Sequence, residues 1–215
     1  MYVPATPPAP AQSLVPVGVV SAAPATIAAP LKTSLKVRHE QLNVLESHRA
    51  SVTGTLLEDH RAGQAGRVVT LQTLGARGWS TISSTHTNAE GRFRLSIVPR
   101  QLGSRWLRLH FHGNAFARSA HRRLGKLNVF RLAGASWYGG GGGLACGGEL
   151  TSSTMGVANK TLPCGTLVTL RYGDHSVRVP VIDRGPYVAG REFDLTEATK
   201  RALGFGDTGD VWSTD

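Results

Sequence analysis

Apolar and polar residues alternate along most of the chain from residue 33 onward, in short segments separated by turn residues. A period of two places successive side chains on opposite faces of a strand, and five segments show it: 51–57, 67–74, 79–85, 92–97 and 105–112. Glycine-containing turns at 75–78 and 88–91 separate some of them. Helical periodicity is almost absent, so residues 33–131 are predicted to form a β-sandwich of immunoglobulin-like size.

A second alternating region begins with 167–172 and 176–182, which read as a hairpin across Gly173 and Asp174. Its second strand places three valines on one face, which we expect to be core: Val177, Val179 and Val181. Pro180 cannot donate to a sheet, so the strand is expected to lie at an edge or to bend there.

Asp183 follows that strand and precedes a tight turn made by Gly185 and Pro186. At the rim of an apolar surface, partial removal from water favours the protonated form of a carboxyl group, which suits a general acid. The alternative is a turn aspartate that accepts hydrogen bonds from nearby backbone amides and has no catalytic role.

A short helix is predicted between Asp194 and Gly204, with Leu195, Ala198 and Leu203 among its apolar residues. Asp194, with Glu197 three residues later, has the pattern of a capping box, and Gly204 ends the helix. The sequence therefore predicts an all-β chain with one short helix.

Charge divides the chain into two parts. Residues 1–131 contain 17 Lys and Arg against 5 Asp and Glu, a net charge of +12, whereas residues 132–215 contain 7 against 9. We therefore expect two domains, 33–131 and 132–215. The basic part predicts an anionic partner, for which the candidates are nucleic acid, an anionic membrane surface and an acidic cell-wall polymer.

Residues 1–32 are rich in Ala, Pro and Val, and we interpret them as a disordered leader or linker. No apolar run approaches the roughly 20 residues that a membrane-spanning helix needs, so no transmembrane segment is expected. Cys146 and Cys164 fit a disulfide better than two free thiols or a zinc site, which favours a compartment outside the cytoplasm.

Basic residues cluster near the end of the first domain, in two groups: Arg105, Arg108, His110 and His112, then Arg118, Arg122, Arg123 and Lys126. They form either a surface that holds an anionic polymer or a solvated face that keeps the domain soluble. A metal site at His110 and His112 would need a third ligand, so none is expected. Specific nucleic-acid binding is not expected either, because neither a recognition helix nor an aromatic platform is evident.

Five motifs in the second domain occur in an order and spacing that resemble the rare lipoprotein A-like double-psi β-barrel family and the first domain of expansins: Ala135-Ser-Trp-Tyr-Gly139, Gly148-Glu149, Asn159-Lys-Thr-Leu-Pro-Cys-Gly-Thr166, Val181-Ile-Asp-Arg-Gly-Pro-Tyr187 and Phe193-Asp-Leu-Thr196. The resemblance implies a six-stranded double-psi barrel with a groove across one face. Enzymatic relatives are lytic transglycosylases that cut peptidoglycan, and expansin-like relatives bind walls without hydrolysis.

The resemblance also assigns residues. Asp183 matches the catalytic acid, and Glu149 matches the second acid of the enzymatic members. The matched positions expected to contact the substrate are Tyr138, Asn159, Arg184, Tyr187 and Asp194. For Asp194 this groove role stands beside the helix cap as an alternative.

Asn159 departs from the enzymatic pattern, which has histidine before Lys-Thr-Leu-Pro. An asparagine amide can orient a sugar by hydrogen bonds but cannot transfer a proton near pH 7. We therefore expect a secreted, monomeric bacterial cell-wall protein that needs no cofactor and acts on peptidoglycan or another anionic wall polymer. It is either a lytic transglycosylase, a non-catalytic expansin-like binding module or a partner of another wall enzyme.

Overall fold

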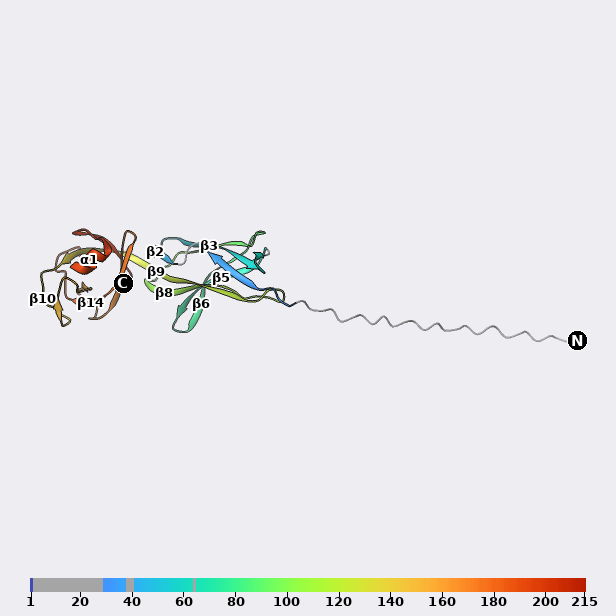
Figure 1. The fold of residues 1–215 in the computed structure, drawn as a ribbon, viewed down its shortest axis with the longest axis horizontal. Helices are drawn as coiled ribbons and strands as arrows, with labels where there is room; N and C mark the ends of the chain where they lie inside the picture. Colours follow the sequence, from blue (N-terminus) through green and yellow to red (C-terminus); the bar gives the residue numbers. More distant parts are fainter. Residues whose placement is uncertain (2–28, 38–40, 64) are drawn as a thin grey trace.

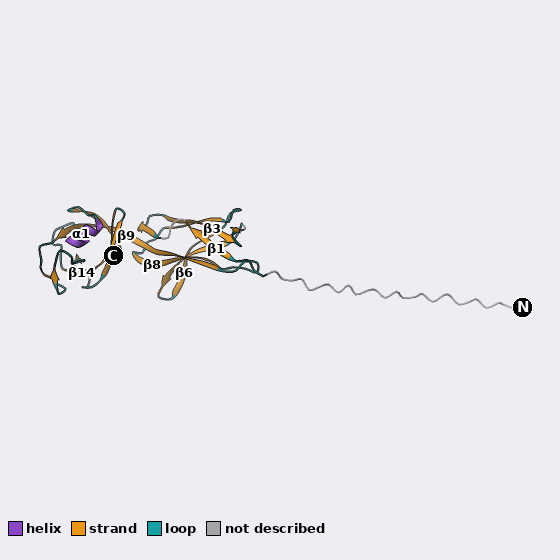
Figure 2. Cartoon of the chain, in the orientation of Figure 1, coloured by secondary structure: helices purple, strands orange, loops and turns teal. Residues whose placement is uncertain are grey.

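The computed structural model describes residues 1, 29–37, 41–63 and 65–215. The predicted leader lies outside the described residues except for 1 and 29–32. The described chain is mostly β, with one short helix, as the sequence predicts (Figure 2). No helix in these residues is long and apolar enough to span a membrane.

Two sheets enclose the first hydrophobic core. One contains β1 (Thr33–Val37), β3 (Ala50–Glu58), β4 (Arg61–Ala62) and β7 (Arg92–Ile97). The other contains β2 (Leu42–Leu45), β5 (Val68–Gly75), β6 (Gly78–His86), β8 (Gly103–Phe111) and the first part of β9 (Ala120–Tyr138). Their inward side chains, such as Leu56 and Leu95 from the first sheet and Leu71 and Leu109 from the second, form one buried cluster. The predicted β-sandwich is confirmed.

The second core lies inside a closed ring of six strands. The ring runs from β9 through β15 (Phe193–Thr196), β12 (Val157–Ala158), β14 (His175–Asp183), β13 (Leu167–Tyr172) and β16 (Thr208–Ser213) back to β9. The β12–β14 and β15–β9 pairs are parallel and the others antiparallel. A two-stranded hairpin, β10 (Gly142–Gly143) and β11 (Glu149–Leu150), lies outside the ring. The predicted six-stranded barrel is therefore present.

Strand β9 belongs to both cores. Its 19 residues contribute Leu127 and Val129 to the first cluster and Ala133 and Ala135 to the second. Figure 1 shows it running from one body into the other. The domain boundary expected at residue 132 thus falls inside a continuous strand. We keep this boundary as a proposal for where the first core ends.

Strand β14 buries the valine face that its pattern predicts. Val179 and Val181 are buried, and Val177 packs against the same cluster. The expectation of an edge strand at Pro180 is wrong, because β14 pairs with β13 on one side and β12 on the other. The Val181 N–H donates to the Thr166 carbonyl on the β13 side. Because successive backbone nitrogens of a strand point to opposite sides, the ring nitrogen of Pro180 faces β12. The pairing of β12 with β14 begins only at Val181, so Pro180 leaves no hydrogen bond unmade there.

Helix α1 (Glu197–Leu203) is capped by a different residue from the one predicted. The Thr196 side chain accepts a hydrogen bond from the Thr199 N–H, whereas Asp194 lies two residues earlier, on β15. The capping box at Asp194 is therefore wrong, because the strand continues through Thr196. Gly204 ends the helix in the left-handed conformation, as predicted.

We expect Thr196→Ala to lower the free energy of unfolding by about 1–2 kcal/mol, because it leaves the Thr199 amide without its cap. Urea denaturation would measure the change. Glu197→Ala is the matched control and should cost only about 0.5 kcal/mol, the value of its ion pair with Arg201. A larger loss for Glu197→Ala than for Thr196→Ala would contradict this assignment.

Cys146 and Cys164 form the expected disulfide, with a sequence separation of 18. It ties the segment that contains β10 and β11 to the loop between β12 and β13. Closing a loop of this size restricts the unfolded chain, which stabilises the fold by about 3 kcal/mol.

The double variant Cys146→Ser/Cys164→Ser should therefore be about 3 kcal/mol less stable in chemical denaturation. Wild-type protein treated with a reductant should show the same loss. Equal stability of the oxidised, reduced and double-variant proteins would show that the crosslink has no effect on folding.

Candidate functional site

Two carboxylates flank one small residue on the barrel wall. Strand β12 lies between β14 and β15, and its Ala158 pairs with Asp183 on one side and Asp194 on the other. A bulge at Ile182 brings Asp183 into this register. Neighbouring strands are about 4.8 Å apart, which separates the two aspartate backbones by about 10 Å. Ala158, the residue between them in register, is small and buried.

Asp183 is held by backbone amides. Its Oδ1 accepts hydrogen bonds from the N–H groups of Ala145, at 2.9 Å, and Arg184, at 2.8 Å. These are the bonds that the turn-aspartate alternative predicts. Both end on Oδ1, so they fix the direction of the carboxyl group and leave Oδ2 for another partner.

Tyr138 brings a phenol close enough to both aspartates for each charge to affect it. It lies on β9, and its hydroxyl oxygen is buried without a hydrogen-bond partner of normal geometry in the described structure. Burial raises the pKa of Tyr138, and the charges of Asp183 and Asp194 raise this pKa further. Hydrogen bonding to Asp183 raises this pKa as well, so the neutral hydroxyl is a donor within reach of that carboxylate.

Asp194 is oriented by its neighbour across the sheet. It pairs in parallel register with Ser136 on β9, whose Oγ donates to Asp194 Oδ1 at 2.7 Å. The sequence motifs contain Ser136 but did not identify it as a site residue. Its spacing of two from Tyr138 on one strand is the signal that could have done so.

The side chains of Asn159 and Arg184 form hydrogen bonds with backbone groups of the protein itself. Asn159 is 2% exposed, its Oδ1 accepts from the Thr161 and Leu162 amides, and its Nδ2 donates to the Glu192 carbonyl. The Arg184 guanidinium donates to the carbonyls of Asn159 and Leu162. Both side chains therefore hold the loop after β12 in this conformation, and their expected contacts with a substrate stay a prediction.

Glu149 and Tyr187 lie on the surface around the aspartates. Glu149 is exposed on β11, in the segment whose Ala145 amide binds Asp183. Tyr187 is 82% exposed and follows the cis bond between Gly185 and Pro186. The structure thus brings together Asp183, Asp194 and Tyr138, and places Glu149 on the neighbouring hairpin.

The glycine run next to this hairpin has a conformational role. Gly140, Gly141 and Gly142 all have positive φ angles, of 100°, 100° and 114°, which other residues rarely adopt. A Cβ atom on Gly140 or Gly142 would meet no atom within 4 Å, so close approach of another chain is not what requires glycine here.

Comparison with known proteins identifies the family that this region resembles. The family described as "Lytic transglycolase" matches residues 132–211. These residues are a lytic transglycolase domain of the RlpA type. We use the name lytic transglycolase domain for them below.

Its relatives are RlpA proteins. The domain is similar to the probable endolytic peptidoglycan transglycosylase RlpA of Aquifex aeolicus (strain VF5), with 41% identity over 33% of each chain. It is also similar to the endolytic peptidoglycan transglycosylase RlpA of Pseudomonas aeruginosa (strain UCBPP-PA14), with 40% identity over 38% of this chain and 26% of the relative. The chain thus spans about a quarter to a third of the length of these relatives.

Solved structures are more distant. The Streptomyces papain inhibitor SPI aligns with 39% of this chain and 91% of its own, at 22% identity and a TM-score of 0.32. Domains 5–6 of the S-layer protein SbsC align with 83% of this chain and 95% of their own, at 13% identity and a TM-score of 0.30.

An ion-pair cluster in the lytic transglycolase domain contains Trp137, the residue before Tyr138 on β9. Trp137 donates its indole N–H to Asp207, and Lys200 binds Asp207 while its ammonium lies 3.8 Å from the centre of the Trp137 ring. Hydrogen bonds from Lys200 and Trp137 lower the pKa of Asp207. This arrangement fixes the Trp137 ring and, with it, the end of β9 that carries Tyr138.

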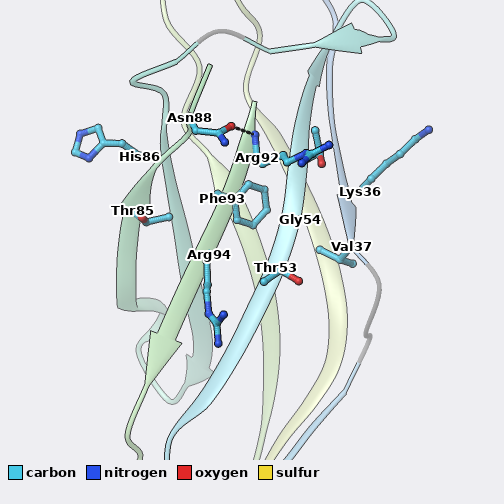
Figure 3. A pocket seen from close by; sticks show the side chains of 11 residues that line it. Lys36, Val37, Thr53, Gly54, Thr85, His86, Asn88, Arg92, Phe93 and Arg94 are labelled. Atoms are coloured by element: carbon cyan, nitrogen blue, oxygen red, sulfur yellow. Dashed lines mark hydrogen bonds between the residues drawn. The ribbon is translucent and has the colours of Figure 1, made fainter. Parts of the chain in front are cut away.

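A separate cavity, of about 820 Å³, lies in the first body, far along the sequence from the aspartates. Figure 3 shows Phe93 at its centre, beside Gly54, with polar side chains spread around it. Its described lining contains Lys36, Arg92, Arg94 and His86 and no acidic residue. The sandwich therefore has a cationic groove that is separate from the site around the aspartates. Within the described residues, no cluster of His, Cys, Asp and Glu could hold a metal ion.

The Tyr138 hydroxyl should titrate at a higher pH than an exposed phenol, because burial and two carboxylates oppose its ionisation. Asp183→Asn should lower the pKa of Tyr138, since it removes one of the two charges. Absorbance near 295 nm as a function of pH would measure this, and Tyr138→Phe would identify the signal. An unchanged titration in Asp183→Asn would mean that Asp183 has no electrostatic contact with Tyr138.

Proposed function

We propose that the lytic transglycolase domain cleaves peptidoglycan glycan strands without using water. The observation that supports this most directly is the placement of Asp183 and Asp194 on either side of Ala158, with the Tyr138 hydroxyl close to both. Cleavage of a glycosidic bond needs one acid for the leaving oxygen and negative charge near the anomeric carbon.

In this proposal, protonated Asp183 donates from Oδ2 to the glycosidic oxygen, and the bond from that oxygen to the anomeric carbon breaks. The 6-hydroxyl oxygen of the same sugar bonds to the anomeric carbon, which closes an anhydro ring. Glu149 takes the proton that this hydroxyl loses, and Asp194 stabilises the positive charge that develops on the ring. Ser136 keeps the Asp194 carboxylate in place for this role.

Tyr138 has a positioning role. Its neutral hydroxyl can donate to Asp183 or to a sugar oxygen. The C-terminal end of β9, which carries Tyr138, is held by the hydrogen bond from Trp137 to Asp207. The exposed Tyr187 offers an aromatic face at the rim for the glycan strand.

The disulfide and the peptidoglycan-acting relatives support a location outside the cytoplasm. We propose peptidoglycan as the partner of this domain and a secreted, wall-associated protein as the whole.

A second function has an observation in its favour. Asn159 stands where the enzymatic pattern has histidine, and its amide forms hydrogen bonds with three backbone groups. A domain without that proton carrier, whose Asp183 is held by two amides, could bind a glycan strand without cutting it. This alternative is an expansin-like wall-binding module.

Mass spectrometry of purified peptidoglycan incubated with the protein would test the cleavage. We expect fragments with anhydro ends from wild type and a loss of at least about 100-fold in Asp183→Asn, the usual size of a general-acid contribution. Asp174→Asn is the matched control, because Asp174 is an exposed aspartate in the turn of the neighbouring hairpin, and it should keep full activity.

Failure of wild type to release any fragment, together with retention on insoluble peptidoglycan in a pull-down, would reject the enzyme and support the binding module. Equal activity of Asp183→Asn and wild type would reject Asp183 as the acid.

A further inference from the structure

The outer face of the second sheet of the sandwich contains no acidic residue. Strands β5, β6, β8 and the whole of β9 include neither Asp nor Glu, although they include six Lys and Arg residues. Within this sheet, Leu107 and Leu109 of β8 point into the core. The alternate residues of this strand, Trp106, Arg108 and His110, therefore point outward.

Cross-strand register places the polar residues on one surface. Gln72 of β5 pairs with Arg108 of β8, which pairs with Arg123 of β9. One step along, Trp106 of β8 pairs with Lys126 of β9. We call the surface made by Trp79, Gln72, Trp106, Arg108, His110, His121, Arg123 and Lys126 the basic sheet face.

Two tryptophans on this face lie beside cations. Trp106 is 51% exposed, and the Lys126 ammonium lies 5.3 Å from its ring centre. The Arg108 guanidinium lies 4.3 Å from the ring centre of Trp79, and its Nε donates to Gln72 at 2.8 Å. Gln72 in turn donates to Thr81 on β6. Arg108 is therefore fixed in place before any ligand arrives, which reduces the entropy lost on binding.

Histidines extend the face along β8 and β9. His110 pairs with His121, and the His110 and His112 rings meet edge to face at 5.6 Å. Partial burial, with the charges of Arg108, His112 and His121, lowers the pKa of His110. The lowered pKa of His110 thus reflects, besides burial, the positive charges gathered on this surface, of which that of Arg108 has the largest effect.

We propose that the basic sheet face binds an acidic polysaccharide, with sugar rings on Trp106 and carboxylates paired with Arg108, Arg123 and Lys126. Exposed indole surface suits the apolar faces of sugar rings, and guanidinium groups suit carboxylates. The absence of acidic residues on these four strands removes the repulsion that such a ligand would otherwise meet. This site is independent of the proposed cleavage, since none of its residues lies in the proposed catalytic site.

Calorimetric titration with polygalacturonate, a carboxylated polysaccharide, would test the proposal on the full chain. Trp106→Ala and Arg108→Ala should each weaken binding by about tenfold or more, as removal of a central interface residue does. Arg123→Ala, at an exposed position, should weaken binding as well. Affinity should fall with added salt, because the contacts are between opposite charges.

Matched controls separate this face from other surfaces. Phe116→Ala removes an aromatic residue that is 74% exposed on the loop after β8 and should leave binding unchanged. Arg92→Ala removes an arginine from the groove in Figure 3 and should also have no effect. Asp183→Asn should bind like wild type, so loss of cleavage and loss of polysaccharide binding are distinguishable.

Three results would overturn the proposal. One is wild-type affinity in both Trp106→Ala and Arg108→Ala. Another is a loss in Arg92→Ala that equals the loss in Arg108→Ala, which would move the site to the groove. The third is binding of duplex DNA more tightly than polygalacturonate at equal salt, which would make the face a nucleic-acid surface. Neutral dextran should bind at least about tenfold more weakly than polygalacturonate.

Discussion

Strand β9 is the constraint on which the rest of the structure depends. Its first half pairs with β8 and β2, and its second half pairs with β15 and β16, so each core is built against a different stretch of one strand. Where the cores meet, Arg131 of β9 forms an ion pair with Glu192, and Phe130 contacts Trp212 of β16. The same strand then delivers Ser136 and Tyr138 to the two aspartates. A change in its register would therefore displace both the sandwich and the candidate site.

Alternation of apolar residues was enough to predict seven of the sixteen described strands, β3, β5–β8, β13 and β14, because a long strand with one face in a core shows the pattern. The valine face of β14 is an example. Strand β9 was missed as a single element because Gly125, with a φ of 75°, forms a bulge opposite Leu107 that shifts the alternation between Leu124 and Leu127. Pro180 was expected to mark an edge or a bend, and the edge was offered because a sequence does not show where a partner strand begins. The two-residue β12 begins one position beyond it.

The candidate site was predictable in part, because motifs identify residue types and not their partners. Asp183 and Asp194 were singled out by the resemblance, and their common neighbour Ala158 became evident only from the register. Asn159 and Arg184 stand at matched positions, yet their polar atoms serve the backbone of the loop after β12. Asp194 was assigned to a helix cap because Glu197 follows at the right spacing. The competing Thr196 satisfies the same amide from a position closer to the helix.

The continuity of β9 also fixes a distance. A strand advances about 3.3 Å per residue, so the 15 residues from Arg123 on the basic sheet face to Tyr138 beside the aspartates span about 50 Å. No flexible linker interrupts that span, because every residue in it belongs to the strand. A chain held to one polymer at the sheet would thus keep its carboxylates at a set distance from that polymer. Glycan strands at about that distance would be within reach, and nearer or farther ones would not.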